Sequence, residues 1–184
     1  MTGIASKSQL RMSFLRHALV TVPAVLLLGT LAGALAGAGE DNAWFAALAK
    51  PGFMPPAWVF GAAWTFLYIL LGLSLAMLLH ARGARGRGRV IGLFLLQLAS
   101  SFAWPPIFFA WHEIELAVTL VAAMAVLTAA LVLLAARIRP LAALLLVPYL
   151  AWLVFAAALT LEIARLNPGA GELAPPGAST DIPL

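Results

Sequence analysis

The chain of 184 residues is 64% hydrophobic and only 10% charged, with a mean hydropathy of +1.02. A soluble domain is near half apolar and a quarter charged, so water is excluded as the solvent for most of this surface, and the length suits one helical bundle. The net charge of +4 would suit a nucleic-acid ligand unless the cations serve another purpose. The absence of cysteine excludes disulfides, thiolate metal sites, iron–sulfur clusters and cysteine nucleophiles.

Five apolar stretches predict membrane-spanning helices. Each lacks Asp, Glu, Lys and Arg over about the 20 residues that a helix needs to cross the hydrocarbon core. The alternative, a β-barrel, uses strands of about 10 residues that alternate apolar with polar, and nothing here alternates. The sequence therefore predicts an all-α integral membrane protein, a bundle of five transmembrane helices. In chain order the stretches are 17–39, 51–81, 90–112, 116–136 and 140–161.

The cations indicate how the bundle is oriented. With five spans, the N-terminus and the second and fourth connections share one side. Because cytoplasmic loops carry an excess of Lys and Arg, the N-terminus is expected in the cytoplasm and the C-terminus outside. The basic charge is then a topological anchor against anionic lipid rather than a nucleic-acid site. The cations of this side are Lys7, Arg11, Arg16, Arg82, Arg85, Arg87, Arg89, Arg137 and Arg139, against Lys50 and Arg165 on the other.

Residues 1–36 also have features of a cleaved signal peptide, namely a basic start, an apolar run and the triplet Ala34-Leu35-Ala36. The apolar run exceeds the core of about 7–15 residues that is usual for such a peptide, so the first span is expected to be retained. The expected organisation is a cytoplasmic segment (1–17), a five-helix membrane domain (18–167) and a disordered tail (168–184).

No Asp, Glu, Lys or Arg lies deep inside a span, and intramembrane ionisable groups mark proton relays and ion pathways. A proton-coupled exporter, an ion channel or a retinal protein is therefore a poor interpretation. His17, His80 and His112 fall at span ends without metal-ligand spacing, so no metal site is predicted.

Aromatic rings recur at helical spacing in three spans, where they share faces with small and polar residues. Such stripes are usually packing or interfacial belts, as expected for Trp58 and Trp111 near span ends. The deeper rings suit a cavity for a flat, mostly apolar ligand, since indoles and phenols combine wide apolar faces with one polar handle. The stripe residues are Phe60, Trp64, Tyr68, Gln97, Ser101, Trp104, Phe108, Tyr149, Trp152, Ala156 and Thr160.

Prolines and glycines give two further hints. Prolines inside the third and fifth spans either open space within the bundle or bend it harmlessly. Glycines at four-residue spacing on the first span suit either a homodimer contact or packing within the chain. These residues are Pro105, Pro106 and Pro148, and Gly29, Gly33 and Gly37.

Three segments carry a more particular pattern. The first contains Trp44-Phe45, Lys50-Pro51, Pro55-Pro56-Ala57-Trp58-Val59-Phe60 and Trp64-Thr65-Phe66-Leu67-Tyr68. The second contains Gln97-Leu98, Trp104 and Pro106-Ile107-Phe108-Phe109, and the third Pro148-Tyr149-Leu150-Ala151-Trp152 with Leu166-Asn167. From Trp44 to Asn167 this order and spacing resemble the translocator protein, or tryptophan-rich sensory protein, family (TspO/MBR).

The resemblance implies a five-helix fold, frequently dimeric, with an aromatic cavity under a lid formed by the first loop. Family ligands are porphyrins and other tetrapyrroles, sterols, and benzodiazepine- or isoquinoline-type drugs. Some bacterial members are reported to degrade protoporphyrin in light, with tryptophans that match Trp64 and Trp152. By motif position the lid would hold Trp44, Pro51, Pro55 and Pro56, and the cavity Trp64, Tyr68, Ser101, Trp104, Trp152 and Ala156.

The chain departs from the family pattern at three places. Ser101 and Thr160 stand where the family usually has Asn, which keeps a hydroxyl but loses an amide. Gly52-Phe53-Met54 replaces a Trp-rich stretch and weakens the aromatic content of the lid. The sterol motif of animal members needs a cation soon after a tyrosine, and Tyr149 is followed by none before Arg165, so that site is not predicted.

The sequence therefore predicts a membrane receptor or scavenger for porphyrin-like ligands, with porphyrin or haem as ligand and no required cofactor. Stacking on Trp64, Trp104 and Trp152 is expected to supply the attraction. The lack of an embedded histidine favours a metal-free tetrapyrrole or non-axial haem binding. Two alternatives stay open. One is a light- and oxygen-dependent porphyrin-degrading enzyme with Trp64 and Trp152 as catalytic residues, and the other is a transporter of apolar metabolites.

Overall fold

The computed structural model describes residues 7–170 as a bundle of helices, with no strand among them. Five spans in this range are long and apolar enough to cross a membrane, α4 and η1 together forming one of them. The predicted five-helix membrane bundle is confirmed. Most of the tail predicted to be disordered, residues 171–184, lies outside the described residues. The elements are α1 (Lys7–Leu35), α2 (Ala43–Ala47), α3 (Ala57–His80), α4 (Arg87–Pro105), η1 (Pro106–Ala110), α5 (Ile114–Ala136) and α6 (Pro140–Leu166).

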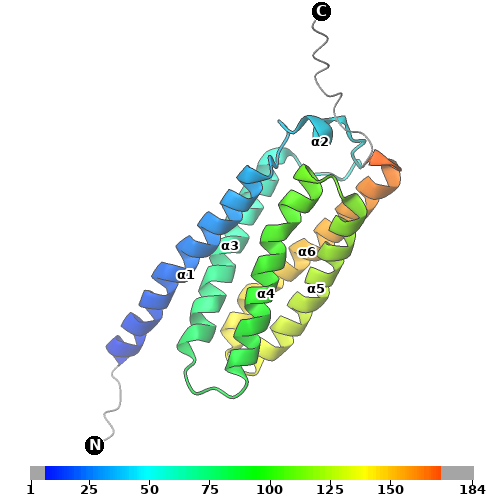
Figure 1. Ribbon diagram of the computed structural model, residues 1–184. Helices are drawn as coiled ribbons and strands as arrows, with labels where there is room; N and C mark the ends of the chain where they lie inside the picture. The colour runs from blue at the N-terminus through cyan, green and yellow to red at the C-terminus, as the bar shows by residue number, and fades with distance from the viewer. Residues whose placement is uncertain (1–6, 171–184) are drawn as a thin grey trace, which may run out of the picture.

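The first connection covers one end of the bundle. Figure 1 shows α2 lying across the end where α3 begins and α6 ends, opposite the start of α1. The charge-free stretch that begins at residue 51 includes a loop, because α3 begins only at Ala57. Pro51, Pro55 and Pro56 precede it, and proline lacks the N–H that a helix interior needs. The chain is therefore free to run over the bundle before α3 starts.

The proline pair in the third span changes the type of helix instead of ending the span. At Pro106 α4 passes into the π-helical turn η1, where the Pro106 carbonyl accepts a hydrogen bond from the Trp111 N–H at 2.9 Å. A π-turn often marks a functional site, and this one carries the buried ring of Phe108. Pro148, in contrast, lies inside α6, which continues to Leu166.

Helix α1 packs directly against α3 through two glycines. A Cβ placed on Gly72 would lie 2.6 Å from the Val22 Cα, so only glycine permits this approach. Beside it the Thr21 hydroxyl donates to the Gly72 carbonyl at 2.7 Å. Further along, Gly29 faces the ring of Tyr68 with no room for a methyl group. Gly29 of the small-residue stripe is thus used within the chain, while a homodimer contact stays a prediction.

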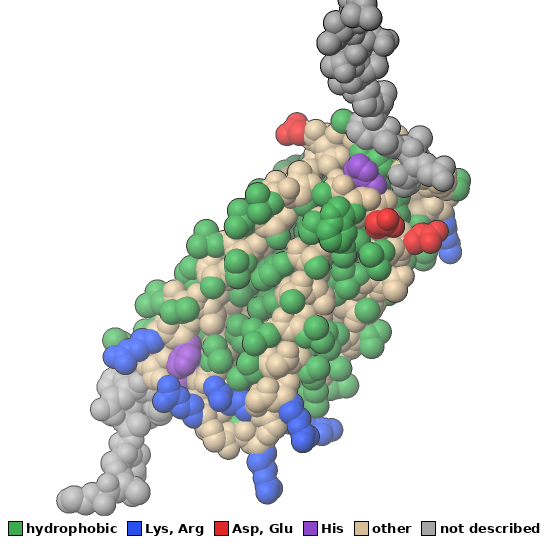
Figure 2. Space-filling model, viewed as in Figure 1, with side chains coloured by type: hydrophobic (Ala, Val, Ile, Leu, Met, Phe, Trp, Pro, Cys, Tyr) green, Lys and Arg blue, Asp and Glu red, His purple; other side chains and the backbone are tan. Residues whose placement is uncertain are grey.

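Charge separates the two ends of the bundle. Figure 2 shows most of the basic side chains gathered where the α3–α4 and α5–α6 turns lie, and the acidic side chains toward the end that carries α2. We call the former the cationic end; its described side chains are Arg16, Arg82, Arg85, Arg87, Arg89, Arg137 and Arg139. Alternating spans place all the acidic residues of the described range at the opposite end, namely Glu40, Asp41, Glu113, Glu115 and Glu162.

We predict that Gly72→Ala lowers the free energy of unfolding by about 1–3 kcal/mol, because the added methyl group overlaps the α1 backbone. Gly92→Ala is the matched control, since Gly92 also lies in a span and an added Cβ there has no neighbour within 4 Å. That change should be neutral or slightly stabilising, as Ala is the better helix former. Thermal unfolding of both variants in one detergent tests this, and equal melting temperatures would contradict the close approach.

Candidate functional site

A cavity of about 350 Å³ lies beneath α2 and the first connection. Aromatic rings from three helical elements form much of its wall, while the chain that follows α1 and the loop before α3 form its roof. The wall and roof are otherwise apolar except for the Thr160 hydroxyl and Glu40. The lining residues are Ala38, Gly39, Glu40, Phe45, Met54, Ala57, Phe60, Gly61, Trp64, Trp104, Phe108, Leu159, Thr160 and Ile163.

A second, smaller cavity of about 220 Å³ adjoins the first. Gly61, Trp64 and Trp104 line both, so the same two indoles are exposed on two sides. The second cavity extends past Tyr68 to Gly29, where α1 packs against α3. Its remaining lining residues are Thr30, Thr65, Pro105 and Phe109.

The aromatic rings hold one another in fixed orientations. Trp104 stacks on Phe108 with centroids 5.0 Å apart and planes 10° from parallel, and its Nε1 donates to the Ala117 carbonyl at 3.0 Å. Trp64 packs on Tyr68 at 5.3 Å. Indoles held in this way present preformed apolar faces, which lowers the ordering cost when a flat ligand binds.

The predicted site residues divide into three sets. Six line the cavities: Phe60, Trp64, Tyr68, Trp104, Phe108 and Thr160. Two pack against the buried core without lining either cavity: Trp152, whose ring meets those of Trp64 and Phe60 edge-on at 6.4 and 5.8 Å, and Ala156. The other three are buried in the bundle and do not line the cavities: Gln97, Ser101 and Tyr149.

These three buried residues form a polar cluster in the bundle. Gln97 donates its amide Nε2–H to the Tyr149 hydroxyl at 3.0 Å. The Gln97 Oε1 and the Ser101 Oγ are buried without a hydrogen-bond partner among the described residues. Orphaned polar atoms are costly in an apolar interior and are usually satisfied by an ordered water. We expect a buried water here, so this cluster serves the bundle more than the ligand.

The roof is pinned to the bundle by side chains of α2 and its cap. Asn42 accepts from the Phe45 N–H at 2.9 Å and donates to the Phe109 carbonyl at 3.1 Å. The Trp44 indole donates to the Ala170 carbonyl at 2.9 Å and stacks on His112 with centroids 4.3 Å apart. Ala170, which falls within the predicted tail, is therefore in contact with the lid.

Asn167 fastens the same loop from the end of α6. Its Oδ1 accepts from the Ala49 N–H at 2.8 Å, and its Nδ2 donates to the Ala49 carbonyl at 2.9 Å. The same Nδ2 also donates to Ile163, one turn earlier. Because Ile163 lines the cavity, the clamp couples the loop to the cavity wall.

The residues predicted for the lid differ from those of the first connection that face the cavity. Trp44, Pro51, Pro55 and Pro56 lie in the roof segment without lining the cavity, whereas Phe45 and Met54 do line it. Met54 belongs to none of the sequence motifs, and Phe45 enters them only as the neighbour of Trp44. For Met54 the available signal is an apolar residue in the loop just before a transmembrane helix, and for Phe45 an aromatic residue in the first connection.

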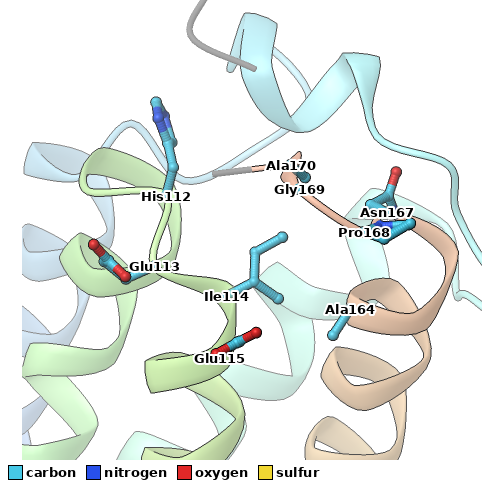
Figure 3. A pocket seen from close by; sticks show the side chains of 9 residues that line it. All are labelled: His112, Glu113, Ile114, Glu115, Ala164, Asn167, Pro168, Gly169 and Ala170. Carbon is cyan, nitrogen blue, oxygen red and sulfur yellow. The ribbon is translucent and has the colours of Figure 1, made fainter. Parts of the chain in front are cut away.

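Another hollow, of about 230 Å³, lies outside the lid between the start of α5 and the end of α6. It includes His112 and two carboxylates but no tryptophan, tyrosine or phenylalanine. Figure 3 shows Glu113 and Glu115 pointing apart, so their charges do not converge on a common centre. Its surroundings lack the stacked rings of the main cavity, and we assign no ligand to it.

Together these features define a class: a five-span membrane protein with an aromatic cavity beneath a pinned loop. The sequence pattern of the TspO/MBR family matches residues 20–166. The chain is 37% identical to the translocator protein of Homo sapiens over 144 residues, which cover 77% of this chain and 85% of that protein. It is 36% identical to the tryptophan-rich protein TspO of Archaeoglobus fulgidus over 147 residues, covering 80% and 94%.

A third relative is the tryptophan-rich sensory protein of Cereibacter sphaeroides, 34% identical over 128 residues that cover 70% of this chain and 79% of that protein. The chain belongs to the TspO/MBR family, as its three sequence segments predicted. The matched range includes all the cavity-lining residues named above, from Gly29 to Ile163.

We predict that Asn167→Ala loosens the lid, because it removes both hydrogen bonds to Ala49. Amide hydrogen exchange over residues 43–50 should become about tenfold faster or more. Arg165→Ala is the control on the same helix end, since it breaks only an exposed ion pair with Glu162. If both variants exchange at the wild-type rate, Asn167 does not hold the loop.

Proposed function

We propose that this protein is a membrane receptor or scavenger that binds a flat, largely apolar, porphyrin-like ligand between Trp64 and Trp104. The observation that carries the proposal is the pair of adjoining cavities that share these two indoles. Aromatic faces attract the π-system of a tetrapyrrole, and the remaining apolar wall excludes water from it.

Size and polarity support a ligand of this class. Ligand cavities of proteins span about 300–1,000 Å³, so the larger cavity falls at the low end of that range. A tetrapyrrole would need space in both cavities, or a displacement of the roof. Neither cavity has a histidine in its wall, which favours a metal-free porphyrin or a haem without an axial imidazole.

Light-dependent porphyrin degradation is a second candidate, favoured by the edge contact between Trp64 and Trp152. An excited porphyrin stacked on Trp64 would accept an electron from the indole, with dioxygen as the final oxidant. Trp152 would support this step through its edge-on contact with Trp64. Movement of ligand across the membrane of sealed vesicles would instead indicate the third candidate function, transport of apolar metabolites.

The orientation in the membrane belongs to the same proposal. We place the cationic end in the cytoplasm by the positive-inside rule, which puts the N-terminus inside and the lid outside. The ligand would then enter from the side of the acidic residues. A homodimer remains compatible with this arrangement, since its contact would lie on the lipid-facing surfaces of the helices.

We predict that Trp64→Phe and Trp104→Phe each weaken binding of protoporphyrin IX by about 3- to 10-fold, because a smaller ring stacks less strongly. The matched controls are Trp58→Phe and Trp111→Phe, since these indoles are 73% and 65% exposed and lie outside both cavities. Tryptophan-fluorescence quenching in detergent measures the affinity. Quenching that never saturates, and is alike in all variants, would overturn the proposed site. Bleaching in light faster than that of free porphyrin would favour the enzyme.

We predict that Gly61→Leu blocks the ligand without unfolding the protein. Gly61 lines both cavities, and a Cβ added there meets no atom within 4 Å, so a leucine side chain has room to project beside the indoles. Glycine is also a poor helix former, so the helix should not suffer. Porphyrin affinity should fall about tenfold or more at an unchanged melting temperature. Unchanged affinity would place the ligand elsewhere.

A further inference from the structure

Two histidines and two arginines come from neighbouring elements at the cationic end, far from the proposed ligand cavity. His17 of α1 and His80 of α3 lie with ring centroids 6.1 Å apart, in an edge-to-face arrangement. Arg82 follows His80 by two residues, and its backbone N–H donates to the His80 carbonyl at 2.7 Å. Arg139 immediately precedes α6, whose first turn packs on α3 through a hydrogen bond from the Ser74 hydroxyl to the Ala142 carbonyl at 2.9 Å. We call these four residues the seam site, because they join α1, α3 and the turn before α6.

The seam site has no anion of its own. Arg82 and Arg139 are exposed, and no ion pair or side-chain hydrogen bond forms at either guanidinium within the described part of the chain. The described carboxylates all lie at the opposite end of the bundle (Figure 2). His80 Nδ1 also has no hydrogen-bond partner among the described residues. Positive charge is therefore concentrated here without internal compensation.

By contrast, Arg87 of the same end is already engaged. Its guanidinium donates to the carbonyls of Leu78 and Leu79 at 2.9 and 2.7 Å, where it caps the end of α3. The cationic end thus contains both a structural arginine and free ones. A positive-inside bias alone does not require the arginines that flank the two histidines in the fold to stay free of partners.

Depth in the membrane identifies the source of the missing anion. The α3 span ends at His80 and the α6 span begins at Pro140, so the seam site lies at the level of lipid headgroups. Beside His17, α1 exposes Leu15 and Leu19, 47% and 73% of whose surfaces are accessible. A phosphate group with acyl chains below it matches this arrangement of cations and apolar surface, whereas a soluble phosphate would use only the cations.

We propose that the seam site binds the phosphate headgroup of an anionic phospholipid, with Arg82 and Arg139 as its ligands. Arginine suits this role, because its planar group donates paired hydrogen bonds to phosphate oxygens. Basic clusters beside transmembrane helices bind anionic lipid in this way. The acyl chains lie along the exposed face of α1. This site is independent of the porphyrin cavity and would persist if the proposed function were wrong.

The test compares phosphatidylglycerol with phosphatidylcholine, titrated into the full-length protein in a neutral detergent at physiological salt. Tryptophan fluorescence reports the melting temperature, and native mass spectrometry counts retained lipid. Phosphatidylglycerol should raise the melting temperature of the wild type to a saturating value that phosphatidylcholine does not reach. In Arg82→Gln/Arg139→Gln, half-saturation should require about tenfold more phosphatidylglycerol or more.

The matched control is Arg85→Gln/Arg89→Gln, which removes the same charge from the same end but leaves Arg82 and Arg139 in place. It should respond like the wild type. If both double variants lose the rise in melting temperature equally, the lipid is attracted only by the overall charge of this end, and the seam site is overturned. If a variant has a lower melting temperature than the wild type in phosphatidylcholine, the amount of lipid retained in native mass spectrometry decides instead. That amount must fall in Arg82→Gln/Arg139→Gln and not in the control. Glycerophosphoglycerol and inorganic phosphate are the soluble arms, and an equal rise with either would overturn the lipid assignment.

Discussion

At Gly72 the backbone of α3 meets the backbone of α1 at Val22, and the space between them would not hold a methyl group. Without a hydrophobic driving force between helices in lipid, such close packing and the Thr21 hydrogen bond to Gly72 are what fix α1 in place. Two turns along α1, Gly29 sets the position of the Tyr68 ring. Tyr68 in turn supports Trp64, so the wall of the cavity depends on how closely two helices approach.

The fold was predictable because the bilayer imposes a strong constraint on sequence. Runs without charge must be helices, and all five were found from that rule alone. Their ends were less certain, since charge marks where a span leaves the membrane and not where a helix starts. The loop that contains Pro51, Pro55 and Pro56 carries no charge, so the charge-free stretch 51–81 includes it. The π-helical turn that begins at Pro106 could not be predicted from the sequence, because a pair of prolines is as typical of a helix break as of a widened turn.

The site was predictable where helical spacing decides which face a residue occupies. Phe60, Trp64 and Tyr68 share a face of α3 and all reach the cavities. Spacing does not say how far a ring projects: Trp152, predicted for the same site, touches Trp64 edge-on without lining either cavity. The lid was harder still. Its position depends on a clamp between Asn167 and Ala49, residues 118 apart in the chain, and no local pattern encodes that pairing.

The hydrogen bonds of the wall bear on what the cavity can distinguish. The Trp104 indole is already committed to the Ala117 carbonyl, and the Thr160 hydroxyl to Ala156 at 2.7 Å. Discrimination between ligands by hydrogen bonding needs polar groups that are left unpaired by the wrong ligand. Because these two groups are satisfied internally, Trp104 and Thr160 select instead by shape and stacking, which tolerates chemically different flat molecules. Finer selection then falls to the roof, where Glu40 is the one ionisable residue lining the larger cavity.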